Sequence, residues 1–326
     1  MLMNSQTESI EAVVDVPPEL SDHRLDQAAA ALMPEHSRSR LQGWIRSGEL
    51  RVNGEVRKPR DRVLVDDHIV ISARIAAEVS WQPEPMALDL LYEDEHLLVI
   101  NKPSGLVVHP AAGHDSGTLV NALLNHAPEL ERIPRAGIVH RLDKDTTGAM
   151  VVARSLEAHT SLVEQLQART MGREYEALCQ GGFTGGGRVE APIGRHPVQR
   201  KKMAVVADGK PAVTHYRLLE RLSGFSLLRC RLESGRTHQI RVHMAHIHHP
   251  ILGDATYGGR TRYPPGADEN IKKVIEGFRR QALHARTLQL LHPTTGEPCE
   301  WQAPLPRDMT RLLDEIRAFT EKSANS

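Results

Sequence analysis

Residues 137–148 read GIVHRLDKDTTG and place a carboxylate, Asp143, two residues after an arginine and one before a lysine. An apolar run precedes this cluster and a glycine ends it. Most charge clusters of this kind are solvated ion pairs on the surface. A carboxylate that must stay ionised in a closed site also needs a cation beside it, because burial alone would neutralise it. The surrounding sequence has to distinguish a solvated turn from a catalytic acid.

The composition is that of a globular protein. The chain of 326 residues is 40% hydrophobic and 25% charged, which allows one sizeable core and a small second domain. Aromatic residues make up only 4%, so a functional aromatic such as Tyr175 stands out. The three cysteines, Cys179, Cys230 and Cys299, form no CxxC pair, and neither a signal peptide nor a membrane-length apolar run is evident. We expect a cytoplasmic protein with no membrane partner.

The formal net charge is +0, but the charges are segregated along the chain. Residues 37–62 hold eight lysines and arginines against three acids, whereas residues 1–22 hold five acids and no base. A local basic face matters more for phosphate binding than the total charge. The cations that we expect to contact nucleic acid here are Arg38, Arg40, Arg46, Arg51 and Lys58.

The first part of the chain predicts a small α/β domain. Residues 1–17 are typical of an acidic flexible tail. A helix is predicted over 21–33 with Ser21 or Asp22 as its N-cap, and a second over 37–48, capped by Ser37 and ended by Gly48. Beyond them the Asn53-Gly54 pair predicts a hairpin turn, and VLVDDHIVI (63–71) predicts strand, turn and strand.

The domain boundaries follow from composition. We assign 18–75 to the basic domain, 76–87 to a proline-bearing linker and 88–326 to a larger domain with a C-terminal helix. Helices are predicted in the larger domain over 117–127, 155–170 and 235–247. Strands are predicted over 97–103, 137–142, 149–154, 174–181, 214–222, 225–233 and 288–293. Strands that follow one another without helices predict an α+β fold with a mixed, mainly antiparallel sheet.

The sequence gives little support for a metal site, a phosphate-binding loop or a serine hydrolase. The densest histidine group, His243, His246, His248 and His249, has no cysteine or carboxylate at a diagnostic metal-ligand spacing. GGFTGGG (181–187) lacks the Lys-Ser/Thr ending of a phosphate loop, and Ser104 is not part of G-x-S-x-G. We therefore expect no metal, although a metal-dependent hydrolase that uses the histidine group remains an alternative.

Two stretches of the chain resemble known families. Residues 20–74 resemble the small RNA-binding module shared with ribosomal protein S4. GIVHRLDKDTTGAMVVARS (137–155) resembles the central motif of the RluA-type pseudouridine synthases. Further segments match that family in order, across almost all of 88–307: LYEDEHLLVINKPSGLVVHP, REYEALCQG, SGRTHQIRVHMAHIHHPILGD and LHARTLQLLHPTTGE. Thr147 stands where many relatives carry serine, which keeps the hydroxyl.

The resemblance implies a role for individual residues. Asp143 would be the catalytic carboxylate, Tyr175 would pack against the target base, and Arg241 would pair with Asp143. Arg236 begins the same basic motif, and Arg141 would displace or hold the flipped nucleotide. Three cations of RHPVQRKK (195–202) would also contact RNA: Arg200, Lys201 and Lys202.

The implied activity is the cofactor-independent isomerisation of uridines to pseudouridine in 23S rRNA. The partner would be 23S rRNA or the assembling large ribosomal subunit, with no nucleotide cofactor, and we expect a monomer. Two alternatives stay open: a non-catalytic RNA-binding or ribosome-assembly protein, and a synthase that acts on another RNA.

Overall fold

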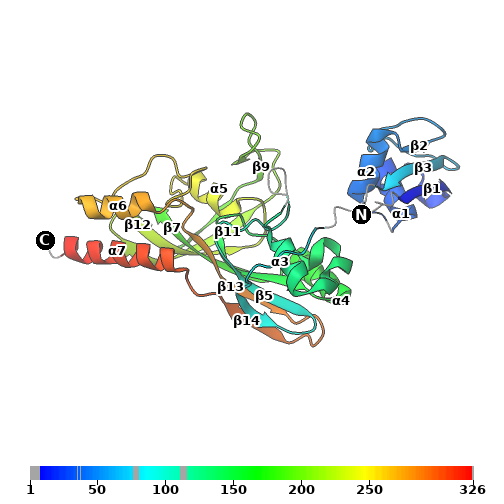
Figure 1. Ribbon diagram of the computed structural model, residues 1–326. Helices are drawn as coiled ribbons and strands as arrows, with labels where there is room; N and C mark the ends of the chain where they lie inside the picture. Colours follow the sequence, from blue (N-terminus) through cyan, green and yellow to red (C-terminus); the bar gives the residue numbers. More distant parts are fainter. Residues whose placement is uncertain (1–7, 35, 37, 76–80, 111–115, 325–326) are drawn as a thin grey trace, which may run out of the picture. The chain divides into compact units, whose positions relative to one another are not determined.

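The computed structural model describes residues 8–34, 36, 38–75, 81–110 and 116–324. The chain divides into two compact units, Met1–Ser80 and Trp81–Ser326, and each has its own hydrophobic core (Figure 1). Within the described residues, none of the helices is both long and apolar enough to span a membrane.

The first unit is a small α/β domain. Its three-stranded antiparallel sheet has the order β1-β3-β2, with β1 at Glu8–Asp15, β2 at Leu50–Val52 and β3 at His68–Ile75. A short 3-10 helix, η1 (Pro18–Leu20), precedes helices α1 (Leu25–Leu32) and α2 (Arg38–Ser47). The apolar stripes of both helices pack with the inner face of the sheet, and the core includes Leu25, Leu41, Ile45, Ile69 and Ile71. The predicted small α/β domain is confirmed.

Three local predictions in this unit are wrong. Residues 8–15 are not a flexible tail, because Ile10, Ala12 and Val14 alternate towards the core and the backbone pairs with β3. The first helix begins after Arg24 and not at Ser21 or Asp22. Residues 63–65 form no strand.

Other local signals in this unit behave as predicted. Asn53 and Gly54 both have positive φ, 53° and 81°, as a tight hairpin turn requires. Gly48, also left-handed, follows the end of α2. Ser37, the predicted cap of α2, lies outside the described residues.

The described residues of the second unit form a nine-stranded sheet of order β4-β5-β6-β13-β7-β12-β11-β8, with β14 beside β13. Its described strand pairs are antiparallel except for β6 with β13. The predicted mixed, mainly antiparallel sheet is therefore confirmed. The strands are β4 (Leu90–Glu93), β5 (Leu97–Lys102), β6 (Thr147–Ala153), β7 (Gly172–Gln180), β8 (Gly187–Glu190), β11 (Val213–Leu222), β12 (Phe225–Leu232), β13 (Leu283–Leu291) and β14 (Pro298–Gln302). A separate hairpin pairs β9 (Ile193–Arg195) with β10 (Met203–Val205).

Helices cover both faces of this sheet. The main core joins the sheet to α3 (Leu119–His126), α5 (Gln239–His246), α6 (Glu269–Gly277) and α7 (Arg307–Ala324). A smaller core packs α4 (Leu156–Gln167) against the other face. Every residue of β6 is buried, because alternate side chains enter the two cores. Two 3-10 helices, η2 (Pro128–Arg132) and η3 (Pro134–Gly137), lead towards β6.

The structure corrects two further predictions. Residues 137–142 are not a strand; they leave η3 as an irregular loop whose apolar residues Ile138 and Leu142 are buried. Residues 81–87 belong to the second unit and not to a linker, because Asn121 Nδ2 donates to the carbonyl of Gln82 and Gly117 N–H donates to the Glu84 carboxylate. The remaining predicted linker residues, 76–80, lie outside the described part of the chain.

Candidate active site

A loop over residues 138–146 carries Asp143 from η3 into β6. Gly137, the last residue of η3, has φ 75°, and Gly148, the second residue of β6, has φ 113°. A Cβ atom at Gly137 would collide with the carbonyl of Ala153, and one at Gly148 with the backbone of Ala285. The two glycines that bracket the motif therefore let the loop ends approach neighbouring strands, which side chains would prevent.

Lys102 anchors the loop through hydrogen bonds to backbone carbonyls, and the sequence analysis did not identify this role. Its side chain is fully buried, and Nζ donates to the carbonyls of Lys144 (2.8 Å), Pro103 (2.8 Å) and Leu106 (2.9 Å). Burial lowers the pKa of Lys102 to about 8, and the Asp145 and Asp143 carboxylates oppose this shift. The only signal in the sequence is a lysine that ends an apolar strand.

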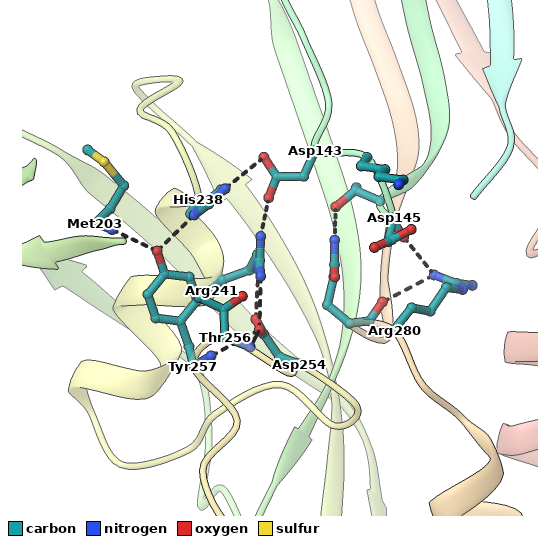
Figure 2. A network of polar contacts seen from close by, with 12 residues as sticks. Asp143, Asp145, Met203, His238, Arg241, Asp254, Thr256, Tyr257 and Arg280 are labelled. Atoms are coloured by element: carbon teal, nitrogen blue, oxygen red, sulfur yellow. Dashed lines mark hydrogen bonds and ion pairs between the residues drawn. The ribbon is translucent and has the colours of Figure 1, made fainter. Parts of the chain in front are cut away.

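A second anchor comes from the segment before β13. Arg280 Nη1 donates to the carbonyl of Asp145 at 3.2 Å (Figure 2). Gln281 Nε2 donates to Thr146 Oγ1 at 3.1 Å. The backbone that follows Asp143 is thus held by segments far away in sequence. Asp145 takes part in this anchor through its backbone carbonyl.

Thr147 forms a third anchor through its hydroxyl group. Thr147 Oγ1 and His284 Nδ1 lie 2.9 Å apart, and both residues are buried. His284 Nε2 is 3.1 Å from the carbonyl of Ala303, which can only accept, so Nε2 carries the proton and Nδ1 accepts from Thr147. Burial lowers the pKa of His284 to about 4, and the ring is therefore neutral at pH 7.

Replacement of Thr147 by valine tests this anchor. Valine nearly keeps the shape but leaves a buried ring nitrogen without its donor, so we expect the free energy of unfolding to fall by about 1–3 kcal/mol. Thr147→Ser keeps the hydroxyl and should lose about 1 kcal/mol or less, for one buried methyl group. Urea unfolding measures both; a valine variant as stable as the serine variant would contradict the assigned hydrogen bond.

Asp143 pairs with Arg241, which comes from α5. Arg241 Nη1 donates to Asp143 Oδ2 at 2.9 Å (Figure 2). The Asp143 side chain is 19% exposed and that of Arg241 is 7% exposed. The contact that the resemblance implied is therefore present, although the two residues are 98 positions apart.

Asp254 holds the other edge of Arg241, and sequence reasoning missed it as well. The guanidinium donates from Nε and Nη2 to the two oxygens of Asp254, at 2.7 and 2.9 Å. Asp254 also accepts the backbone N–H groups of Thr256 and Tyr257. Burial opposes both charges, yet these bonds lower the pKa of Asp254 and raise that of Arg241. Arg241 therefore stays cationic, and its orientation is fixed before it meets Asp143.

Asp143 lines a pocket of about 550 Å³, and Tyr175, on β7, lines the same pocket. Tyr175 is 6% exposed, and burial raises the pKa of its hydroxyl group, so the hydroxyl stays protonated and the side chain is uncharged. Asp143 and Glu233 are the acids among the described lining residues. Six arginines line the same pocket: Arg135, Arg141, Arg169, Arg173, Arg236 and Arg241. A pocket with this excess of cations suits an anionic ligand of nucleotide size.

The other predicted RNA contacts lie on the surface. In the pocket wall Arg141 is exposed, and Arg236 Nε donates to the carbonyl of Pro211. In the loop between β9 and β10, Arg200 and Lys201 are exposed and Lys202 is half-buried.

In the first unit Arg46, Arg51 and Lys58 are exposed and Arg40 is half-buried. Arg38 is engaged by the buried carboxylate of Asp26, at 2.7 Å. This contact gives Arg38 a structural role in addition to the predicted contact with RNA.

The histidine group of 243–249 does not converge. His243 is buried, and its ring contacts Thr214 Oγ1 and the carbonyl of Ala191. His249 Nδ1 contacts the carbonyl of Gln180. Across the described residues, histidines, cysteines and carboxylates form no group of three that could hold a metal ion.

Comparisons with known proteins match both units. Residues 96–246 match the RNA pseudouridylate synthase family, and residues 23–69 match the S4 domain. The chain is 57% identical over 315 residues to "Ribosomal large subunit pseudouridine synthase D" of Pseudomonas aeruginosa, across 97% of this chain and 98% of that protein. The protein of the same name from Escherichia coli K12 is 53% identical over 300 residues, 92% of each chain.

Solved structures agree with these matches. "Human RNA Pseudouridylate Synthase Domain Containing 4" superimposes with a TM-score of 0.56 and 29% identity, over 70% of this chain and 93% of that one. "Human RNA Pseudouridylate Synthase Domain Containing 1" has a TM-score of 0.51 and 25% identity, over 72% and 98%.

Proposed function

The chain belongs to the RNA pseudouridine synthase family, and from this membership we propose that it isomerises uridines of large-subunit rRNA to pseudouridine, with Asp143 as the catalytic carboxylate. The observation that carries the proposal is the Asp143 carboxylate, held by Arg241 at the wall of an arginine-lined pocket beside Tyr175.

The reaction breaks the N-glycosidic bond, rotates the uracil and joins carbon 5 to the same sugar, and the proton of carbon 5 is released and replaced at nitrogen 1. Nothing is oxidised and no external group is transferred, so the chemistry requires no cofactor. It does require a carboxylate that remains ionised while bound RNA excludes water. Arg241 supplies the compensating charge, and it is itself held by the buried Asp254.

Two routes use this carboxylate. Asp143 can attack the anomeric carbon and form a covalent ester of the sugar, or it can remove a proton from ribose carbon 2 to give a glycal. Arg241 engages Oδ2, and Oδ1 is then the oxygen that performs either step. Both routes need an ionised Asp143 and one unengaged oxygen.

The target base has to leave the helical stack before it can react. Extrusion costs a few kcal/mol and less for loop or unpaired bases, so loop uridines are the expected substrates. Stacking on Tyr175 would offset roughly 1–3 kcal/mol of this cost. The pocket arginines would bind the phosphates on either side, which positions the nucleotide without reading its sequence.

The large-subunit substrate is proposed from the names of the relatives and from the S4 domain at residues 23–69. With an rRNA substrate we also propose that the protein acts in the cytoplasm. Tritium release from 23S rRNA labelled at uracil carbon 5 tests the activity directly, because formation of the new carbon–carbon bond expels that hydrogen. Wild-type protein that releases no tritium from 23S rRNA would refute the proposal.

The exposed cations of the S4 domain give a prediction about binding. We expect the triple variant Arg46→Gln, Arg51→Gln and Lys58→Gln to bind 23S rRNA more weakly and with a shallower salt dependence. The slope of log K against log salt should fall by about 0.7–0.9 for each phosphate that the variant no longer neutralises. Filter binding across a salt series measures it, and kcat at saturating RNA should be unchanged. A matched control replaces three exposed acids, Glu11, Glu55 and Asp66, by their amides; an equal effect there would contradict a docking role for the basic face.

A further inference from the structure

His238 is a residue of the pocket that the proposed reaction does not yet use. It immediately precedes α5 and adopts φ 57° and ψ 22°, a left-handed conformation that is uncommon for residues other than glycine, although histidine adopts it more often than most. Within the described structure its side chain makes no capping hydrogen bond to the helix that it begins. A residue kept in this conformation without capping the helix is a candidate for a role at the site.

The ring of His238 has a defined hydrogen-bond arrangement. His238 Nδ1 lies 2.8 Å from the hydroxyl oxygen of Tyr257, and this oxygen accepts the backbone N–H of Met203 at 2.9 Å (Figure 2). The Tyr257 oxygen accepts from Met203 and keeps its own hydrogen, and we assign that hydrogen to a bond donated to Nδ1. The neutral ring then carries its proton on Nε2.

That Nε2–H group faces Asp143. The distance from His238 Nε2 to Asp143 Oδ1 is 3.8 Å, and Arg241 engages the other oxygen, Oδ2, at 2.9 Å. Asp143 Oδ1 is therefore the oxygen left for chemistry, and His238 is the group beside it. The gap is slightly longer than a hydrogen bond and would close with a small movement of either side chain.

We propose that His238 is a positioning residue for the isomerisation: its Nε2–H aims Oδ1 of Asp143 at the bound nucleotide, while Tyr257 fixes the ring tautomer. This inference rests on the proposed function, because it assumes that Asp143 performs the reaction. Contacts then run from β10 to the reacting carboxylate: the Met203 N–H bonds to Tyr257, Tyr257 bonds to His238, and His238 faces Asp143.

Protonation of His238 should weaken the site. Burial lowers the pKa of His238 below its ordinary 6.5, although the Asp143 carboxylate opposes this shift. A second cation beside Asp143 would make Oδ1 a weaker base and nucleophile, so kcat should fall as the pH drops through the pKa of His238. The charged and titratable groups that face the ring are Asp143, Arg141, Arg241, Asp254 and Tyr257.

Three variants of His238 separate positioning from a purely structural role. His238→Gly relieves the left-handed backbone, so it should melt no lower than wild type, yet its kcat should fall roughly tenfold to a hundredfold with KM unchanged. His238→Ala should lose a similar factor in kcat. His238→Gln keeps an N–H near the Nε2 position and should retain kcat within about tenfold, with the acid limb of its pH profile moved to lower pH because glutamine does not titrate.

Tyr257→Phe tests the tautomer, since it removes the donor to Nδ1 and keeps the aromatic ring; its kcat should fall by up to about tenfold. His238→Gly or His238→Ala with wild-type kcat and an unchanged acid limb would overturn the inference, and so would a glutamine variant as inactive as the glycine variant. Asp143→Asn and wild type are assayed beside them. Inactive wild type would overturn the proposed function itself, whereas active wild type with inactive Asp143→Asn upholds that function whatever the His238 variants do.

Discussion

Asp143→Asn is expected to abolish tritium release from labelled 23S rRNA, with a loss of about 10⁴-fold or more in the single-turnover rate. An amide oxygen can still accept the hydrogen bond from Arg241, so the fold and the pocket should be preserved. The amide can neither attack the anomeric carbon nor remove a ribose proton at neutral pH, and both routes are lost together. RNA binding should change little, because the arginines that line the pocket remain.

The matched control is Asp145→Asn in the same loop. Asp145 is hydrogen-bonded to Arg280 through its backbone carbonyl, which the substitution keeps, and it is not among the residues that line the pocket. We expect this variant to keep the rate within a few-fold. Equal loss in both variants would indicate a general effect of loop charge, and tritium release by Asp143→Asn at the wild-type rate would refute the assignment of Asp143.

Asp254→Ala is expected to impair both stability and catalysis. The Asp254 side chain is fully buried and Arg241 is nearly so, and removal of one partner of such a pair costs up to about 3–5 kcal/mol, the upper end applying to a charge with no other partner; Arg241 keeps Asp143. The freed guanidinium would also turn towards Asp143 and engage both of its oxygens. We expect kcat to fall by about a hundredfold or more, since the reacting oxygen is then occupied.

Glu220→Ala is the control for this prediction. Arg317 also binds Glu220 through Nε and Nη2, but these side chains are 39% and 33% exposed, so the pair should contribute about 1 kcal/mol or less. Urea unfolding and single-turnover tritium release compare the two variants. If Asp254→Ala and Glu220→Ala lost similar free energies of unfolding, burial of the Asp254 ion pair would not make it the more stabilising of the two.

The pH dependence of stability gives an independent check on Asp254. Its pKa in the folded protein is lower than the ordinary 3.8, so the folded state binds fewer protons than the unfolded state between these two values. The stabilisation is therefore complete above pH 3.8 and is lost as the pH falls through the folded pKa. The difference in unfolding free energy between wild type and Asp254→Ala should shrink over this acid range and stay constant at neutral pH.

Local patterns predicted most of the regular structure. Consecutive strands without helices indicated the mainly antiparallel sheet, and glycine signals marked the end of α2 and the hairpin after β2. The errors have local causes. Among the described strands, residues 8–15 pair with β3 alone, and an acidic edge strand has the composition of a tail. Residues 137–142 have the apolar content of a strand, but they are buried as a loop.

The resemblance pointed to Asp143, Arg241, Tyr175, Arg141 and Arg236, all of which line the pocket, but it did not point to the groups that hold Asp143 and Arg241 in place. Lys102 contacts the carbonyl of Lys144, and Asp254 contacts Arg241 across 13 positions, without a spacing that would single out either residue. His238 lies in the matched segment SGRTHQIRVHMAHIHHPILGD, but its position beside Asp143 was not predicted.

The amino-acid sequence indicated most of the secondary elements, the basic face and the candidate carboxylate, because periodicity, charge and motifs are properties of neighbouring residues. Only the tertiary structure decided which oxygen of Asp143 is engaged, which buried groups hold its loop and which ring faces it. These depend on distances of about 3–4 Å between segments that fold together from remote parts of the chain, and a hydrogen bond exists only at such distances.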